Sequence, residues 1–155
     1  MGHVGNAEDS LENGSGDWSR NPEDFYTDPD QAREYVRLTS ADALAVAVGT
    51  LRGTYKSQPK LDYNRIGEIT KAVGIPLVLH GGSGLSEEAF STAISHGICK
   101  VNIFTDINGA MTAGARQALK SGKAFGTDLI LSEIEHIKQA AAAKMKIFAC
   151  CGKAG

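Results

Sequence analysis

The sequence predicts an α/β fold in which parallel strands are covered by helices. Three apolar segments of strand length, at 43–48, 75–79 and 98–103, are each followed by a loop and then by a segment of helical periodicity. Strands that lack polar alternation are typical of parallel sheets buried between layers of helices. A closed eight-unit barrel takes about 250 residues, so the 155 residues present hold about half of one or, alternatively, a small open sheet.

The first predicted helix follows a polar, glycine-rich segment at 1–27, which we expect to be a long loop. Asp28 and Pro29 predict the helix start, because aspartate caps helix N-termini and proline suits the first helical position. The helical pattern then runs to about Leu38.

The next elements repeat the order strand, loop and helix. After the strand at 43–48 and a glycine-rich loop, a helix begins at Asp62, with Ile66, Ile69 and Val73 at helical spacing. Further along the chain the sequence predicts a strand at 75–79, a loop at 80–84 and a helix at 86–96. A strand at 98–103 and two helices at 106–120 and 128–144 follow.

The clearest candidate site is the loop after the second strand. Ligand sites of parallel β/α folds form at the carboxyl ends of strands, and here His80 enters the loop Gly81-Gly-Ser83-Gly84 before a helix. Glycine N–H groups, a serine hydroxyl and a helix dipole favour an anion such as phosphate, and His80 is a potential metal ligand beside it. The alternative is a histidine satisfied by a local carbonyl, with glycines that only turn the chain.

Two other strand ends carry polar side chains. Asn102 lies near the end of the third strand, and Thr105 opens the following helix; alternatively, Thr105 is only an N-cap and Asn102 only ends the strand. Arg52 and Gly53 follow the first strand. Arg52 is either a phosphate ligand or a solvated loop charge.

Composition narrows the classes of function. The net charge of −2 gives no electrostatic reason to expect nucleic acid or a membrane as partner. The three cysteines, two of them adjacent, match neither a disulfide framework nor a zinc-knuckle spacing, so we expect a cytoplasmic protein. The first residues lack the pattern of a secretion signal, and no apolar run is long enough to span a bilayer.

Three motifs in order resemble those of the class II fructose-bisphosphate and tagatose-bisphosphate aldolases: Val-Gly-Thr-x-x-Gly-x-Tyr from 48, Pro-Leu-Val-Leu-His-Gly-Gly-Ser-Gly-Leu from 76, and Gly-Ile-x-Lys-Val-Asn-Ile-x-Thr-Asp from 97. The resemblance implies the C-terminal half of a TIM (β/α)8 barrel. It implies one partial domain, with a mobile loop at 1–27, β/α units at 28–120, and a C-terminal helix and tail at 121–155.

The same resemblance implies reversible cleavage of a ketose bisphosphate, fructose or tagatose 1,6-bisphosphate, to dihydroxyacetone phosphate and glyceraldehyde 3-phosphate with a divalent metal, usually zinc. It assigns His80 as a metal ligand, Asn102 as a catalytic contact to the substrate near its reacting carbons, and Glu8 as the acid/base on the mobile loop. Taken alone, Glu8 would be a surface charge. The phosphate-binding positions would be Gly53, Gly81, Ser83 and Thr105. Members of this family commonly form homo-oligomers.

Two departures from the family pattern affect the metal. Arg52 stands where the family has a metal-binding histidine, and arginine cannot ligate zinc because it stays protonated. The Asp-His-His segment, which supplies a catalytic aspartate and another histidine, belongs to the family's first half, which this chain does not contain. Since catalytic zinc takes three protein ligands and only His80 remains, we expect that the chain alone does not retain zinc and cleaves substrate negligibly.

Three hypotheses therefore remain open. The chain is a protein derived from a metal-dependent aldolase, or a catalytically inactive sugar-phosphate-binding fragment or companion subunit that needs no metal. As a third possibility, it is a truncated reading frame without independent function, because Met1 falls within the family's motif for the fifth strand.

Overall fold

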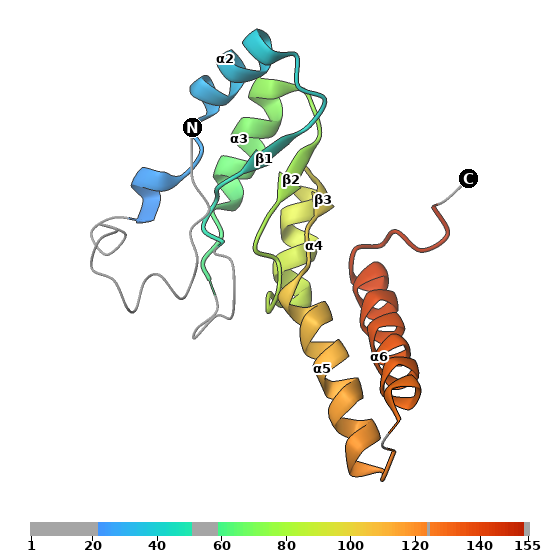
Figure 1. Cartoon of the computed structure of the whole chain (residues 1–155). Helices are drawn as coiled ribbons and strands as arrows, with labels where there is room; N and C mark the ends of the chain where they lie inside the picture. The colour runs from blue at the N-terminus through green and yellow to red at the C-terminus, as the bar shows by residue number, and fades with distance from the viewer. Residues whose placement is uncertain (1–21, 51–58, 124, 154–155) are drawn as a thin grey trace. The chain divides into compact units, whose positions relative to one another are not determined.

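A computed structural model describes residues 22–50, 59–123 and 125–153 of the chain. The chain divides into two compact units, Met1–Ile103 and Phe104–Gly155, and each is described by itself. The α-helices and strands of both units are labelled in Figure 1. The predicted positions Glu8, Arg52 and Gly53 lie outside the described residues.

The first unit contains a parallel sheet of three strands. The strands are β1 (Leu44–Val46), β2 (Leu77–Leu79) and β3 (Ile98–Val101), and they lie in the order β1-β2-β3. Each strand pairs in parallel with its neighbour. The predicted α/β fold with parallel strands is therefore confirmed, whereas the assignment of these strands to half of a TIM barrel stays a prediction.

The helices of this unit begin within one residue of the starts that the sequence predicts. They are α2 (Pro29–Thr39), α3 (Tyr63–Val73) and α4 (Glu87–Ser95). Side chains of Asp28, Asp62 and Ser86 accept hydrogen bonds from the backbone N–H groups three residues later. Such caps satisfy N–H groups that have no partner inside the helix.

The end of the segment predicted as a long loop at 1–27 contains one short helical turn. Residues Pro22–Phe25 form a short 3₁₀ helix, η1, which Tyr26 closes by donating its N–H to the Glu23 carbonyl at 3.1 Å. Proline fixes a backbone angle that suits the first turn of a helix, and acidic side chains at Glu23 and Asp24 favour that end electrostatically. A single turn carries no hydrophobic periodicity, so the pattern could not reveal it.

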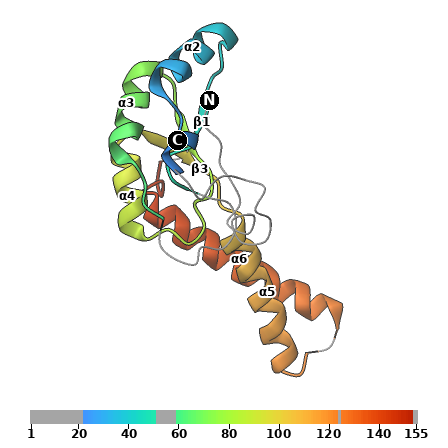
Figure 2. The ribbon, with the colours of Figure 1, turned by 90° about the vertical axis from the view of Figure 1, so that its left-hand side faces the viewer.

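The core of the first unit lies between the sheet and its helices. Ile66 and Ile69 of α3, together with Phe90 of α4, are completely buried, as are Leu77 and Leu79 of β2. Figure 2 shows α3 and α4 on one side of the strands. Removal of these apolar side chains from water stabilises the unit. Of the three residues at helical spacing after Asp62, Ile66 and Ile69 are buried and Val73 is half-buried.

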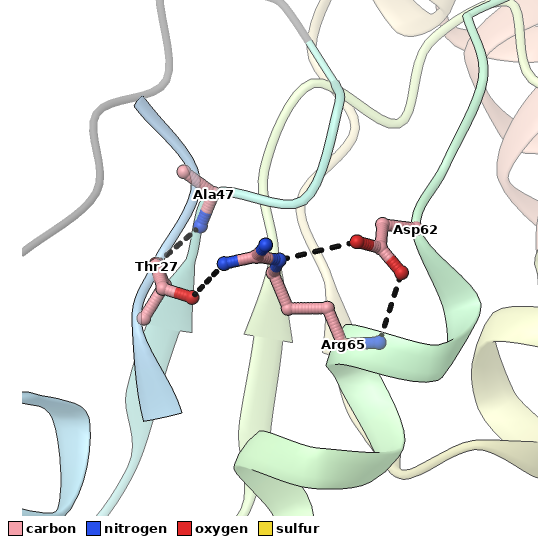
Figure 3. A network of polar contacts seen from close by, with 4 residues as sticks. All are labelled: Thr27, Ala47, Asp62 and Arg65. Atoms are coloured by element: carbon pink, nitrogen blue, oxygen red, sulfur yellow. Dashed lines mark hydrogen bonds and ion pairs between the residues drawn. The ribbon is translucent and has the colours of Figure 1, made fainter. Parts of the chain in front are cut away.

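A polar network joins the segment before α2 to the end of β1 and the start of α3 (Figure 3). The Thr27 N–H donates to the Ala47 carbonyl at 2.8 Å, and the Ala47 N–H donates to the Thr27 hydroxyl at 2.9 Å. Arg65 donates to the Thr27 carbonyl at 3.3 Å and to the Asp62 carboxylate at 3.1 Å. The network fixes the start of α2 against the end of β1.

The pairing of β2 with β3 contains an irregularity of one residue. Leu77 pairs with Ile98, but Val78 pairs with Lys100, so Cys99 is the additional residue on β3. Ile98 is buried, whereas Cys99 and Lys100 are both exposed. A bulge of this kind changes which side chains beyond it face each side of the sheet.

The second unit is a pair of helices, α5 (Thr105–Lys120) and α6 (Gly126–Ile147). The two helices pack closely at Gly114 of α5, where a side chain would not fit. An added Cβ would lie 2.7 Å from the carbonyl oxygen of Ser132 in α6. Lys144 and Asp106 form an ion pair of 2.6 Å between the two helices. The alternative of Thr105 as N-cap is wrong, because Phe104 occupies that position and Thr105 is already helical.

Candidate functional site at the carboxyl ends of β2 and β3

Two of the predicted site residues meet where β2 and β3 end. His80 directly follows β2 and Asn102 directly follows β3, and both are half-buried. The Asn102 N–H donates to the Leu79 carbonyl at 2.9 Å, which extends the ladder of the sheet by one bond. The Asn102 side-chain nitrogen lies 3.2 Å from Nδ1 and 3.4 Å from Nε2 of His80. The parallel pairing therefore brings the predicted metal ligand and the predicted substrate contact into direct contact.

The loop after His80 has the conformation that its glycines allow. Gly81 and Gly84 have φ angles of 68° and 79°, in the left-handed region that glycine adopts without strain. Gly82 is packed tightly, because an added Cβ would lie 2.8 Å from a methyl carbon of Val101. Ser83 is 6% exposed. Glycine thus brings this loop's backbone close to β3.

The N-terminus of α4 contributes less to anion binding than its position after the loop suggests. The Ser86 hydroxyl already accepts the Ala89 N–H at 3.1 Å, and Glu87 and Glu88 place two carboxylates in the first turn. Since carboxylates there complement the helix dipole, they oppose a second anion at the same end. The N-terminus of α4 is therefore less suited to a phosphate than its position suggests, and the phosphate-binding roles of Gly81 and Ser83 stay predictions.

Thr105, the remaining predicted phosphate ligand within the described residues, opens α5 in the second unit. It is half-buried. Its neighbour Asp106 is engaged by Lys144, and their side chains are only 28% and 19% exposed. The role assigned to Thr105 stays a prediction, as do the roles of Glu8 and Gly53.

Lys100 is a site residue that the sequence analysis missed. Its Nζ donates to the side-chain oxygen of Asn102 at 2.7 Å. The sequence contains a signal for this contact, because residues two apart in a strand project to the same face, and Lys100 and Asn102 have that spacing.

Another unpredicted feature is a buried hydroxyl after β1. Thr50 is 3% exposed, and its oxygen has no hydrogen-bond partner in the described part of the chain. Thr50 belongs to the Val-Gly-Thr motif. The sequence signal for this buried hydroxyl is therefore a small hydroxyl residue that follows a strand and a glycine.

A cavity of about 540 Å³ lies at the start of α3 and was also not predicted. Burial raises the pKa of Tyr26 in its wall, the carboxylates of Glu23 and Asp62 raise it further, and the cation of Arg65 opposes them. The guanidinium carbon of Arg65 lies 5.6 Å from the centre of the Tyr26 ring. The residues that line the cavity are Glu23, Tyr26, Lys60, Leu61, Asp62, Tyr63 and Asn64.

The described residues do not by themselves fit a catalytic metal. They contain no group of three or more His, Cys, Asp or Glu side chains placed to hold an ion. Catalytic zinc normally takes three protein ligands, and His80 supplies one. Over the same residues, no helix is long and apolar enough to cross a bilayer.

The fold and this site define the class of protein. A parallel β/α sheet whose polar side chains gather at the carboxyl ends of adjacent strands belongs with the α/β proteins that bind ligands at that edge. The model of the class II fructose-bisphosphate aldolase family matches residues 1–153. This chain belongs to the class II fructose-bisphosphate aldolase family.

Solved structures agree with the family assignment. The YdjI aldolase from Escherichia coli K12 is 40% identical, with a TM-score of 0.77, over 84% of this chain and 48% of its own. A proposed fructose-1,6-bisphosphate aldolase from Coccidioides immitis is 28% identical, with a TM-score of 0.80, over 98% of this chain and 51% of its own. Fructose-bisphosphate aldolase from Campylobacter jejuni is 23% identical over 83% of this chain and 47% of its own, with a TM-score of 0.66, and shows the shared fold. This chain spans about half the length of each.

Proposed function

We propose that this chain forms the C-terminal half of a class II ketose-bisphosphate aldolase barrel and binds the dihydroxyacetone phosphate part of the substrate. The observation that carries the proposal is the contact between Asn102 and His80, 3.2 Å from side-chain nitrogen to Nδ1, beside a glycine loop. Membership of the aldolase family supports the reaction class. The match to about half of each solved aldolase supports the assignment to half a barrel.

The proposed reaction is the reversible cleavage of fructose or tagatose 1,6-bisphosphate to dihydroxyacetone phosphate and glyceraldehyde 3-phosphate. Asn102 donates a hydrogen bond to an oxygen near the reacting carbons, where negative charge develops. Gly81 and Ser83 bind the phosphate with backbone N–H and hydroxyl groups, and Gly53 and Thr105 add to them. Glu8 transfers the proton.

The family's divalent metal is not assigned to the described residues, since these provide His80 and no complete ligand set. What the described chain does alone is to bind and orient. It holds the phosphate at the loop after β2 and presents the Asn102 amide at the end of β3. Cleavage also needs the proton transfer assigned to Glu8 and a complete metal site, toward which the described residues supply His80.

A second candidate function is sugar-phosphate binding without metal or catalysis. The observation that favours it is Arg52, which stands in the sequence where the family motif has a metal-binding histidine. An arginine at that place donates hydrogen bonds to a phosphate and repels a metal cation. The two candidates share the phosphate site and differ in their response to zinc.

Calorimetry of the purified chain with dihydroxyacetone phosphate tests the shared site. In the presence of a chelator we expect saturable binding at millimolar ligand. Ser83→Ala should weaken binding about tenfold, the effect of one hydrogen bond to a charged group. Ser91→Ala is the matched control, because its hydroxyl bonds the Glu88 carbonyl at 3.0 Å within α4. The absence of binding heat, or an equal effect of both variants, refutes the proposed site.

Zinc separates the two candidates. The same titration is repeated with zinc in place of the chelator, and cleavage of fructose 1,6-bisphosphate is followed in a coupled assay. Zinc-dependent cleavage by the chain alone establishes the aldolase and contradicts our expectation of negligible activity. Binding that is equally strong with zinc and with chelator, without cleavage, favours the metal-free binding protein.

A further inference from the structure

We propose that Lys100 is a positioning residue that fixes the direction in which Asn102 presents its side-chain amide. The inference rests on the proposed function, because it concerns the group that contacts the substrate. Lys100 Nζ donates to the Asn102 oxygen at 2.7 Å, and the Asn102 nitrogen lies 3.2 Å from His80 Nδ1. The three side chains form a continuous row across the ends of β2 and β3.

The bulge in β3 is what makes this row possible. Side chains of a regular strand alternate, so Ile98, which is buried, would place Lys100 on its own side of the sheet. Because Cys99 is an additional residue opposite Val78, Lys100 instead lies across from Val78 on the opposite face. Asn102, two residues further, follows Lys100 to that face. One inserted residue therefore brings lysine and asparagine to the side on which they meet His80.

The chemistry of the three groups determines the orientation of the amide. An asparagine side chain has an accepting oxygen and a donating NH₂ group, and a lysine ammonium only donates. The oxygen of Asn102 must therefore face Lys100, which leaves the NH₂ group toward His80 and toward a substrate bound there. In the contact with His80 the NH₂ group of Asn102 is then the donor.

The contact is not a by-product of charge pairing on the surface. Lys100 is exposed, and in the described part of the chain no salt bridge includes it. Its ammonium group is directed instead at a neutral amide oxygen. Without this anchor the amide can turn by half a rotation and present its oxygen to His80, which would remove the donor that the substrate needs.

Nuclear magnetic resonance on the full chain without ligand tests the orientation directly. Lys100→Met keeps the aliphatic stem and removes the donor, Lys100→Arg keeps a cationic donor, and Lys71→Met removes an exposed lysine from the last turn of α3 as control. We expect Lys100→Met to shift the Asn102 side-chain amide and the ring nitrogens of His80. Lys100→Arg should restore the wild-type signals, and Lys71→Met should leave them unchanged. Wild-type signals in Lys100→Met, or equal shifts in the Lys71 variant, overturn the inference.

A second arm adds dihydroxyacetone phosphate to the same samples. Lys100→Met should weaken binding about tenfold, and Lys100→Arg should restore it to within about threefold. Weakened binding with unchanged Asn102 and His80 signals would mean that Lys100 acts on the ligand by its charge, which overturns positioning. If the wild-type chain does not respond to the ligand while the amide signals still depend on Lys100, the proposed function fails and the positioning stands.

Discussion

Replacement of Gly82 by alanine tests how closely the site loop packs on β3. The backbone of Gly82 lies outside the left-handed region, so the substitution probes space alone. The new Cβ would lie 2.8 Å from Val101 Cγ1, 3.0 Å from Ile103 Cδ1 and 3.3 Å from Phe90 Cε1. Ordinary carbon contacts lie at ~3.5–4.0 Å, so these neighbours must move by several tenths of an ångström.

The expected cost follows from which neighbour can move. The end of Ile103 can rotate, but Val101 is β-branched and stiff, and Phe90 is completely buried. Overpacking typically costs ~1–3 kcal/mol, and we expect Gly82→Ala to lower the free energy of unfolding by about 2 kcal/mol. Urea denaturation measures this, and displacement of the loop should also weaken binding of dihydroxyacetone phosphate.

Gly67→Ala is the control with the opposite expected sign. This glycine lies inside α3, and an added Cβ would meet only His96 Cδ2, at 3.9 Å. Alanine favours a helix over glycine by ~0.5–1 kcal/mol, so this variant should be more stable than wild type. Adding Val101→Ala to Gly82→Ala should recover at least ~1 kcal/mol beyond additivity. Wild-type stability of Gly82→Ala, or strict additivity of the pair, refutes the reasoning.

Other substitutions probe strain, an ion pair and a titration. Gly97→Ala should lower the free energy of unfolding by about 3 kcal/mol or more, because φ is +121° and the new Cβ would lie 2.0 Å from the Thr70 hydroxyl oxygen. Gly74→Ala should lower it by only ~1 kcal/mol, because φ is +65° and no atom lies within 4 Å of the new Cβ. Equal costs in urea denaturation would contradict this. Lys144→Met breaks the pair with Asp106 and should destabilise the unit by ~1–2 kcal/mol, and an unchanged thermal transition would argue against it. Burial raises the pKa of Tyr26 above 10.0, so its contribution to stability is complete below that pH and is lost as pH rises through the folded pKa. Tyr26→Phe should therefore lose less stability than wild type when urea denaturation is measured at increasing pH above 10.0. Equal losses in the two proteins would exclude Tyr26 as the cause.

The order of elements and the helix caps could be predicted because they depend on local chemistry. Asp28, Asp62 and Ser86 cap helices where the sequence places them, since capping needs only one side chain and the next turn of backbone. The buried face of α3 was predictable for the same reason, because Ile66 and Ile69 lie at helical spacing. These features do not depend on the rest of the fold.

The details of the candidate site depend on pairing between distant segments, and the sequence does not encode them locally. Cys99 is an additional residue only in the pairing of β3 with β2, so no pattern within β3 alone predicts the bulge. The contact of Lys100 with Asn102 has a local signal in their spacing of two, but the face on which both residues meet His80 follows from that bulge. Phe104 as N-cap of α5 was missed because it makes no side-chain cap hydrogen bond, which leaves no compositional signal.

The pairing of Thr27 with Ala47 has a consequence for self-association. Both the N–H and the carbonyl of Ala47 are taken by Thr27, and within a strand these two groups of one residue point to the same side. That side faces away from β2, where an incoming strand from another molecule would otherwise dock. A strand that paired with β1 at Ala47 would therefore first have to displace Thr27. The segment before α2 thus occupies an edge position through which the sheet could otherwise recruit a strand from another molecule.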